Sequence, residues 1–339
     1  MKLLTVVIPT YNMATLLPRC LDSFTKPNIL NDLEVLVVND GSKDNSLEIA
    51  QQYEKKYPGI IYAIDKPNEN YGSTVNKGIE LATGKYFRIC DSDDFFDNLQ
   101  LTNLLEFLRG ADVDLVLNDY IIDRQNHHCV MKISNIEVGK IYKMDDVDLS
   151  TLGNYAMHGL IVKTQILQQN NISLLTGISY TDTEFCYYPL QYAKTLSYIN
   201  LPVYRYQVGR DGQTVSLASQ LRCLSHMKKI IDRMFEDINE VGDANILRNK
   251  SFVLSRILNL YFSTALCYDR TNAEWNNMLR VNDRIQEFTD LLNYMKMGNM
   301  FGVRFYNRFN EKRKPSNGLF YTLYYQIVKK LIHIYRTLK

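Results

Sequence analysis

Short apolar runs that alternate with helical patterns fill the first third of the chain, and this alternation constrains the fold more than any other feature. Five runs have the length and the β-branched content of strands: 3–8, 34–39, 60–64, 85–90 and 113–118. Helical spacing occupies the intervals, with one helix opening after Asp44-Asn45-Ser46 and another at Ser73. Strands that alternate with helices predict an α/β fold with a mostly parallel, Rossmann-like central sheet.

The pattern changes after this first third and again near residue 217. Residues 198–207 read as strands broken at Pro202, and long helical periodicity takes over from about residue 217. A polar stretch with glycines, Gly209–Gly212, has the character of a loop between the two regions. We therefore expect an α/β domain over 1–215 and a helical C-terminal region over 216–339.

Charge is nearly balanced overall but is uneven along the chain. Thirty-nine Lys and Arg residues against 37 Asp and Glu residues argue against a nucleic-acid-binding protein. Residues 304–339 nevertheless carry nine basic residues and one acid, and within them 319–339 place apolar side chains on one helical face. This pattern predicts a basic amphipathic helix. Such a helix suits peripheral contact with an anionic membrane, or packing on its own domain, and the sequence leaves both readings open.

The cysteines and the apolar segments indicate where the protein works. Six cysteines are scattered without a C-x-x-C pair, which fits a reduced, cytoplasmic protein. The N-terminal apolar run before Pro9 is too short for a secretory signal, and no stretch has the length of a membrane span. We expect a cytoplasmic protein, with peripheral contact at the inner membrane face left open.

Polar segments follow three of the predicted strands. They are Pro9-Thr10-Tyr11-Asn12, Asp40-Gly41-Ser42 and Asp91-Ser92-Asp93-Asp94. Ligands of parallel sheets bind at the carboxyl ends of the strands, where such loops gather. The three segments therefore predict one shared binding site.

The acidic segment predicts a cation in this site. The chain has no G-x-G and no P-loop motif, so backbone amides of a glycine-rich loop are not available to hold phosphates. Carboxylates such as those of Asp91 and Asp93 bind Mg²⁺ or Mn²⁺, which in turn bridge phosphate oxygens. The alternative is that the acids cap the helix expected near 99–109, and the segment alone does not decide between the two.

Four motifs together resemble the inverting family 2 glycosyltransferases of GT-A fold. They are LTVVIPTYN (4–12), VVNDGSKDNS (37–46), NYGSTVNKGIELATG (70–84) and ICDSDD (89–94). Their order and spacing match the family, and the resemblance covers roughly residues 3–215. It implies a nucleotide-sugar-binding half over 1–118 and an acceptor half over 119–215.

The resemblance also implies roles for single residues. Thr10 and Tyr11 would flank the nucleobase, Asp40 would accept a hydrogen bond from it, Asp91 would hold the ribose and Asp93 the metal. The full set implied to bind nucleotide is Pro9, Thr10, Tyr11, Asn12, Asp40, Gly41, Ser42, Asn70, Gly72, Asn76, Asp91 and Ser92. Val75 departs from the family, because many relatives carry Arg there.

Transfer to a hydroxyl group requires a general base, and the resemblance implies Asp182. The segment Tyr180–Phe185 matches the family motif, with Thr181 where relatives have Glu. Asp182 is also a good helix cap, and Glu184 is the second candidate for the base. Further along, Arg210 lies in a glycine-containing loop and could bind the diphosphate, or could be a surface arginine.

These features predict a metal-dependent inverting glycosyltransferase. It would use Mn²⁺ or Mg²⁺ to move a sugar from a nucleotide-diphosphate sugar, a UDP-sugar, to a hydroxyl of a glycan or lipid-linked acceptor in cell-surface polysaccharide biosynthesis. A sugar nucleotidyltransferase, a non-catalytic nucleotide-sugar or glycan-binding module and a two-carboxylate glycosidase are the alternatives.

Overall fold

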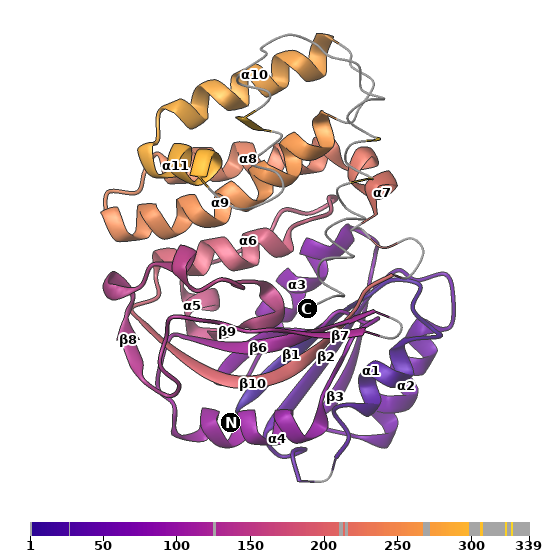
Figure 1. Cartoon of the computed structure of the whole chain (residues 1–339). Helices are drawn as coiled ribbons and strands as arrows, with labels where there is room; N and C mark the ends of the chain where they lie inside the picture. The colour runs from indigo at the N-terminus through magenta and orange to yellow at the C-terminus, as the bar shows by residue number, and fades with distance from the viewer. Residues whose placement is uncertain are drawn as a thin grey trace. The chain divides into compact units, whose positions relative to one another are not determined.

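The computed structural model of the protein forms two compact units, Met1–Asp211 and Gly212–Lys339 (Figure 1). The residues that the structure describes are 2–26, 28–124, 127–209, 213, 216–266 and 272–297, with the single positions 306, 307, 323 and 327.

The first unit is built on a ten-stranded sheet in the order β3-β2-β1-β4-β9-β6-β10-β5, with β7 on β6 and β8 on β10. The strands are β1 (Leu4–Thr10), β2 (Leu33–Asp40), β3 (Ile61–Lys66), β4 (Tyr86–Ile89), β5 (Phe95–Phe96), β6 (Leu115–Arg124), β7 (His127–Met131), β8 (Ile141–Lys143), β9 (Leu160–Lys163) and β10 (Thr195–Gln207). The four strands β3, β2, β1 and β4 are parallel to one another. The predicted α/β fold with a mostly parallel central sheet is confirmed.

Helices cover both faces of this sheet because the order in which strands are added reverses after β3, so that β4 pairs with the other side of β1. The helices are α1 (Leu17–Asp22), α2 (Ser46–Lys56), α3 (Asn70–Leu81), α4 (Asn98–Gly110), α5 (Thr164–Gln169) and α6 (Asp182–Tyr187). Right-handed crossovers put α1 and α2 on one face as the sheet grows from β1 to β3, and put α3 on the other face as the chain returns to β4 (Figure 1). The carboxyl ends of β1, β2 and β4 therefore share one edge.

The central strands are buried on both faces. Every residue of β1, β2 and β4 is buried, as expected for parallel strands between two helical layers. Side chains such as Val7, Val37 and Phe87 are fully inaccessible. This rigid core fixes the positions of the loops at the strand ends.

One strand prediction is confirmed only in part. The segment 198–207, predicted to break at Pro202, belongs to the continuous strand β10. Its pairing with β6 shifts register between Ile199 and Tyr204, so Pro202 lies where the ladder is interrupted and no backbone donor is required. The second half of β10 then pairs with β5, next to the acidic segment.

The second unit is helical, as predicted for the C-terminal region. Its helices are α7 (Leu217–Arg222), α8 (Leu224–Ile238), α9 (Ala244–Ala265), α10 (Asn272–Gln286) and α11 (Thr289–Met297). Apolar faces of α8 and α9 supply its core, including Met227, Ile231, Leu254 and Leu258. The amphipathic helix predicted over 319–339 lies outside the described residues, except for the positions 323 and 327. Among the described helices, none combines the length and the apolar character needed to span a bilayer.

A buried ion pair joins α8 to α9 in this unit. The Lys250 side chain is fully buried, and its Nζ lies 2.7 Å from Oδ2 of Asp237. Burial lowers the pKa of Lys250, whereas its hydrogen bond to Asp237 acts in the opposite direction. Removal of Asp237 would take this charge-assisted hydrogen bond from the buried ammonium.

We therefore expect Asp237→Ala to destabilise the second unit by about 1.5–3 kcal/mol, because a hydrogen bond between charged groups contributes an amount of this size. Calorimetric unfolding of the whole protein measures this as a lower Tm for the affected transition. Glu137→Ala is the control, since it breaks the exposed Glu137–Lys140 pair and should change stability by no more than about 0.5 kcal/mol. Equal effects of the two variants would contradict this interpretation.

Candidate active site

The loops after β1 and β2 are joined by hydrogen bonds. The backbone N–H of Asn12 donates to Ser42 Oγ at 3.0 Å, and Asn12 Oδ1 accepts from the N–H of Lys43 at 2.7 Å. Asn12 and Gly41 both adopt positive φ angles, 52° and 66°, which Asn and Gly tolerate best. Between these loops Tyr11 is 46% exposed, so its ring is available for stacking.

Asp40 ends β2 and is held from the neighbouring strand. Its Oδ1 accepts from Lys66 Nζ at 2.8 Å and from the backbone N–H of Glu69 at 3.0 Å. Lys66 is the last residue of β3, which is paired with β2. This buried carboxylate is thereby fixed in one orientation.

The start of α3 connects Asp40 to the acidic segment. Two residues after Glu69, the Tyr71 hydroxyl donates to Asp91 Oδ1 at 2.8 Å. Asn70 adopts a positive φ of 66°, which turns the chain into the helix. The stretch 69–71 therefore contacts both Asp40 and Asp91, although these two residues are far apart in the chain.

Two other residues of this motif, Asn76 and Gly72, contact the segment 174–175 of the protein instead of the binding edge. Asn76 donates from Nδ2 to the carbonyl of Leu174 at 2.8 Å and accepts at Oδ1 from the N–H of Leu174 at 2.7 Å. A Cβ on Gly72 would lie 2.0 Å from the carbonyl oxygen of Leu175, so only glycine fits there. Both residues hold the segment before Asp182 against α3.

The acidic segment is anchored to β10. The Tyr204 hydroxyl accepts from the N–H of Asp91 at 3.0 Å and donates to Asp94 Oδ2 at 2.6 Å, while Asp94 Oδ1 accepts from the N–H of Gln207 at 2.7 Å. Both oxygens of the buried Asp94 carboxylate are thus engaged. The alternative in which the segment caps α4 is wrong, because Asp97 supplies the cap through bonds to the N–H groups of Leu99 and Gln100.

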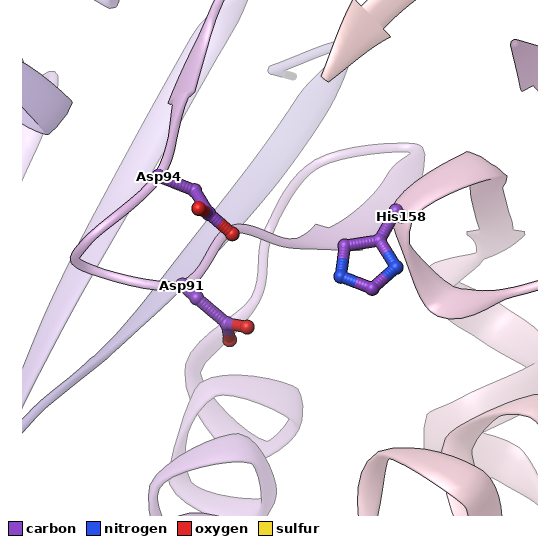
Figure 2. Close-up of side chains that lie close together, drawn as sticks. All are labelled: Asp91, Asp94 and His158. Carbon is purple, nitrogen blue, oxygen red and sulfur yellow. The ribbon is translucent and has the colours of Figure 1, made fainter. Parts of the chain in front are cut away.

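His158 faces the acidic segment from the short turn η3 (Met157–Gly159). Figure 2 shows Asp91 and Asp94 extending from one loop toward the His158 ring. In the described part of the chain, these three form the group whose ligand atoms could hold a metal, all within 4.8 Å of one another. The ring is stacked on Tyr206 with centroids 4.3 Å apart, which limits its rotation.

The donor set fits a divalent cation. Carboxylate oxygens suit Mg²⁺ and Mn²⁺, and an imidazole nitrogen adds preference for the transition metal. Asp93, the predicted metal ligand, is not in the group of three, but its charge lies close enough to act on Asp91. Hydrogen bonds from Tyr71, Tyr204 and Gln207 use only part of the acceptor capacity of the two carboxylates, so the geometry offers Asp91, Asp94 and His158 to the ion.

The electrostatics of the site also favour a cation. Burial, followed by repulsion from Asp93, raises the pKa of Asp91 to about 8, against the hydrogen bond from Tyr71, which lowers it. Burial and the charges of Asp91 and Asp93 likewise raise the pKa of Asp94 well above its ordinary value. Carboxylates forced together in this way are stabilised by any positive charge that binds among them.

Asp182 is the first residue of α6. Its charge contributes to the raised pKa values of Asp91 and Tyr71, so it lies near both residues. Thr181, not Asp182, occupies the N-cap position and makes no side-chain capping bond. Tyr180, just before it, has a positive φ of 72°, a conformation that costs a non-glycine residue energy and that often occurs at functional sites.

Glu184, the second candidate for the base, is fully buried and accepts from the N–H of Leu175 at 2.8 Å. Its position supports the fold of the segment and not proton transfer at the site. Arg210 lies outside the described residues.

The structure thus brings the three predicted strand-end segments to one edge, with Asp182 beside the acidic one. Sequence reasoning missed three residues that hold this arrangement together: Lys66, Tyr71 and Tyr204. Tyr71 lies inside the motif 70–84, between Asn70 and Gly72. This position is the only feature of the sequence that could have marked it as a site residue.

Comparison with known proteins agrees with this geometry. Residues 5–167 match the family described as Glycosyl transferase family 2. An uncharacterized glycosyltransferase of Mycoplasma pneumoniae is 45% identical over 97 residues, which is 28% of this chain and 32% of the relative. The poly(ribitol-phosphate) beta-glucosyltransferase of Bacillus spizizenii is 28% identical over 283 residues, 80% of this chain and 43% of the relative. The chain thus spans less than half the length of these two curated relatives.

Solved structures show the same fold. Residues 1–349 of S. aureus TarS in complex with UDP-GlcNAc have a TM-score of 0.61 at 20% identity, covering 84% of this chain and 81% of that TarS chain. The mannosyltransferase PcManGT of Pyrobaculum calidifontis, in complex with GDP-Man and Mn²⁺, has a TM-score of 0.52 at 15% identity, covering 92% of this chain and 87% of the neighbour. Residues 5–167 thus match glycosyltransferase family 2, the family that the motifs resemble, and the chain has the GT-A fold that these motifs predicted.

The raised pKa of Asp91 predicts how the stability of the metal-free protein depends on pH. The folded carboxyl keeps its proton up to about pH 8, whereas the unfolded one loses it near 3.8, so the folded state binds more protons between these values. Stability should therefore fall as the pH rises through this window. Thermal unfolding in chelator at pH 6 and pH 8.5 measures the loss.

The Asp91→Asn variant is the control for this prediction. It has no proton to lose at this position, so its Tm should fall less between the two pH values than that of the wild type. Identical pH dependence in both proteins would contradict the assignment to Asp91.

Proposed function

We propose that the protein is a metal-dependent inverting glycosyltransferase, a hexosyltransferase that uses a nucleotide-diphosphate sugar, and that this sugar is a UDP-sugar. The proposal assigns residues 1–215 to catalysis, with donor binding in 1–118 and acceptor binding in 119–215. The observation that carries it is the meeting of three strand-end loops at one sheet edge, where ligand atoms of Asp91, Asp94 and His158 lie within 4.8 Å of one another. Asp182 is close enough for its charge to act on Asp91. The complexes of TarS with UDP-GlcNAc and UDP support the choice of a uridine nucleotide.

Donor binding follows from the contacts at the strand ends. The exposed ring of Tyr11 would stack on the base, and the fixed carboxylate of Asp40 would accept from it. Tyr71 occupies Asp91 Oδ1, so Oδ2 of the same carboxylate would accept from a ribose hydroxyl. Other residues predicted to bind the nucleotide belong to the same strand-end loops, among them Pro9, Thr10, Ser42 and Ser92.

The diphosphate would lie beside the acidic segment. We assign the cation to Asp93, as the motif predicts, and to Asp94 and His158 of the observed group, which leaves Asp91 for the ribose. The bound cation would neutralise the negative charge of the leaving diphosphate. Arg210 is proposed as a second positive charge on the diphosphate, because a guanidinium pairs with phosphate oxygens in bidentate fashion. Both charges would stabilise the transition state more than the ground state.

Asp182 would act as the general base. In a single displacement the acceptor hydroxyl attacks the anomeric carbon from the face opposite the diphosphate, which inverts the configuration at that carbon. The hydroxyl proton passes to the Asp182 carboxylate as the new glycosidic bond forms.

The acceptor is proposed to be a glycan or a lipid-linked glycan of a cell-surface polysaccharide. The similarity to a poly(ribitol-phosphate) beta-glucosyltransferase over 80% of this chain supports this choice. We also propose that the protein acts in the cytoplasm, with peripheral contact at the inner membrane face through the basic helix predicted over 319–339.

The base assignment predicts a specific kinetic defect. Asp182→Asn should lower kcat by about 10²- to 10⁴-fold, because a positioned base contributes a factor of this size. UDP affinity in Mn²⁺ should stay within about threefold, since the change lies in the proton acceptor and not in the donor contacts. Sugar transfer and UDP release, measured with a panel of UDP-sugars, provide the test.

Asp112→Asn is the matched control, because Asp112 is an exposed carboxylate of the same unit that pairs with Lys163. It should keep wild-type kcat. Full activity of Asp182→Asn would refute the base assignment. Release of pyrophosphate from a nucleoside triphosphate, or UDP binding without any transfer or hydrolysis, would favour the nucleotidyltransferase or the non-catalytic module instead.

A further inference from the structure

Lys66 makes a set of contacts that the family motifs do not account for. Its ammonium lies 2.8 Å from Asp40 Oδ1, 2.9 Å from Ser73 Oγ and 2.5 Å from the carbonyl of Pro67. The side chains of Lys66 and Asp40 are only 14% and 5% exposed, so the pair is largely shielded from solvent. The ammonium therefore has a fixed position beside one oxygen of Asp40.

The two oxygens of Asp40 are consequently unequal. Oδ1 accepts two hydrogen bonds, from Lys66 Nζ and from the backbone N–H of Glu69, which use both of its lone pairs. Among the described residues, no donor reaches Oδ2. Asp40 can therefore accept hydrogen bonds from a ligand through Oδ2 alone, and not through both carboxylate oxygens.

We propose that Lys66 determines which nucleobase the protein accepts, by limiting Asp40 to a single acceptor. Such an Asp40 accepts a base that presents one ring N–H, as uracil does, and rejects guanine. This inference rests on the proposed function, in which Asp40 faces the base of the donor nucleotide.

The hydrogen-bonding edges of the bases explain the selection. Uracil presents one N–H between two carbonyl groups, so a single carboxylate oxygen satisfies its donor. Guanine presents a ring N–H and a neighbouring amino group, which together need both oxygens of a carboxylate. With Oδ1 already occupied, the amino group of guanine would be buried without an acceptor, and an unpaired buried donor weakens binding.

Inosine diphosphate isolates this one interaction, because inosine is guanosine without the amino group. We expect wild-type protein in Mn²⁺ to bind GDP at least about fivefold more weakly than inosine diphosphate, from the cost of one unpaired donor. UDP should bind more tightly than CDP, since cytosine has no ring N–H to donate. Competition titrations with these four diphosphates give the ranking. This part of the test uses only the wild-type protein, so it does not depend on the folding of a variant.

Lys66→Met tests the lysine itself. The variant frees a lone pair on Asp40 Oδ1, so the penalty for GDP relative to inosine diphosphate should shrink at least threefold. Lys77→Met is the matched control: Lys77 belongs to α3 and pairs with Glu80 on the same helix, and its loss should leave the ratio unchanged. Thermal unfolding of both variants identifies folded protein.

Wild-type protein that binds GDP more tightly than inosine diphosphate would overturn the inference. A folded Lys66→Met variant with the wild-type ratio would also overturn it. If the protein transfers sugar from a UDP-sugar despite either result, the proposed function stands and only the role of Lys66 is rejected. If none of the four diphosphates binds, both are rejected.

Discussion

The site depends on holding several carboxylates close together against their mutual repulsion. Burial and the charge of Asp93 raise the pKa of Asp91, and the same effects act on Asp94. The arrangement persists because hydrogen bonds from α3 and β10 fix it: Tyr71 holds the Asp91 carboxylate, and Tyr204 and Gln207 hold the Asp94 carboxylate. A bound cation would stabilise a cluster prepared in this way.

The topology explains why these contacts are possible. The strands β1, β2 and β4 are parallel neighbours, so their carboxyl ends lie at one edge of the sheet, and the start of α3 crosses that edge. As a result, the short stretch from Lys66 to Tyr71 contacts both Asp40, where the base would bind, and Asp91, where the ribose would bind. Asp40, proposed to bind the base, and the acidic cluster are thus parts of one hydrogen-bonded unit.

Much of the fold could be predicted from the sequence, because the strands of a parallel sheet are continuous apolar runs and the helices between them have a clear period. Only the site residues that lie in sequence motifs could be predicted. Lys66 and Tyr204 act through contacts 26 and 110 residues away along the chain, and no local pattern marks such contacts. Conversely, Asn76 and Gly72 belong to a motif, but in the structure they pack against Leu174 and Leu175. A motif residue can therefore serve the framework of a site and not its ligand.

The measurement that tests the central claim most directly is the affinity for UDP with and without Mn²⁺, in wild-type protein and in Asp93→Asn. If the acidic cluster binds a cation that in turn binds the diphosphate, UDP should bind the wild type at least about tenfold more tightly with Mn²⁺ than in chelator, and Asp93→Asn should lose most of that gain. Equal UDP affinity of the wild type in both conditions would contradict the account.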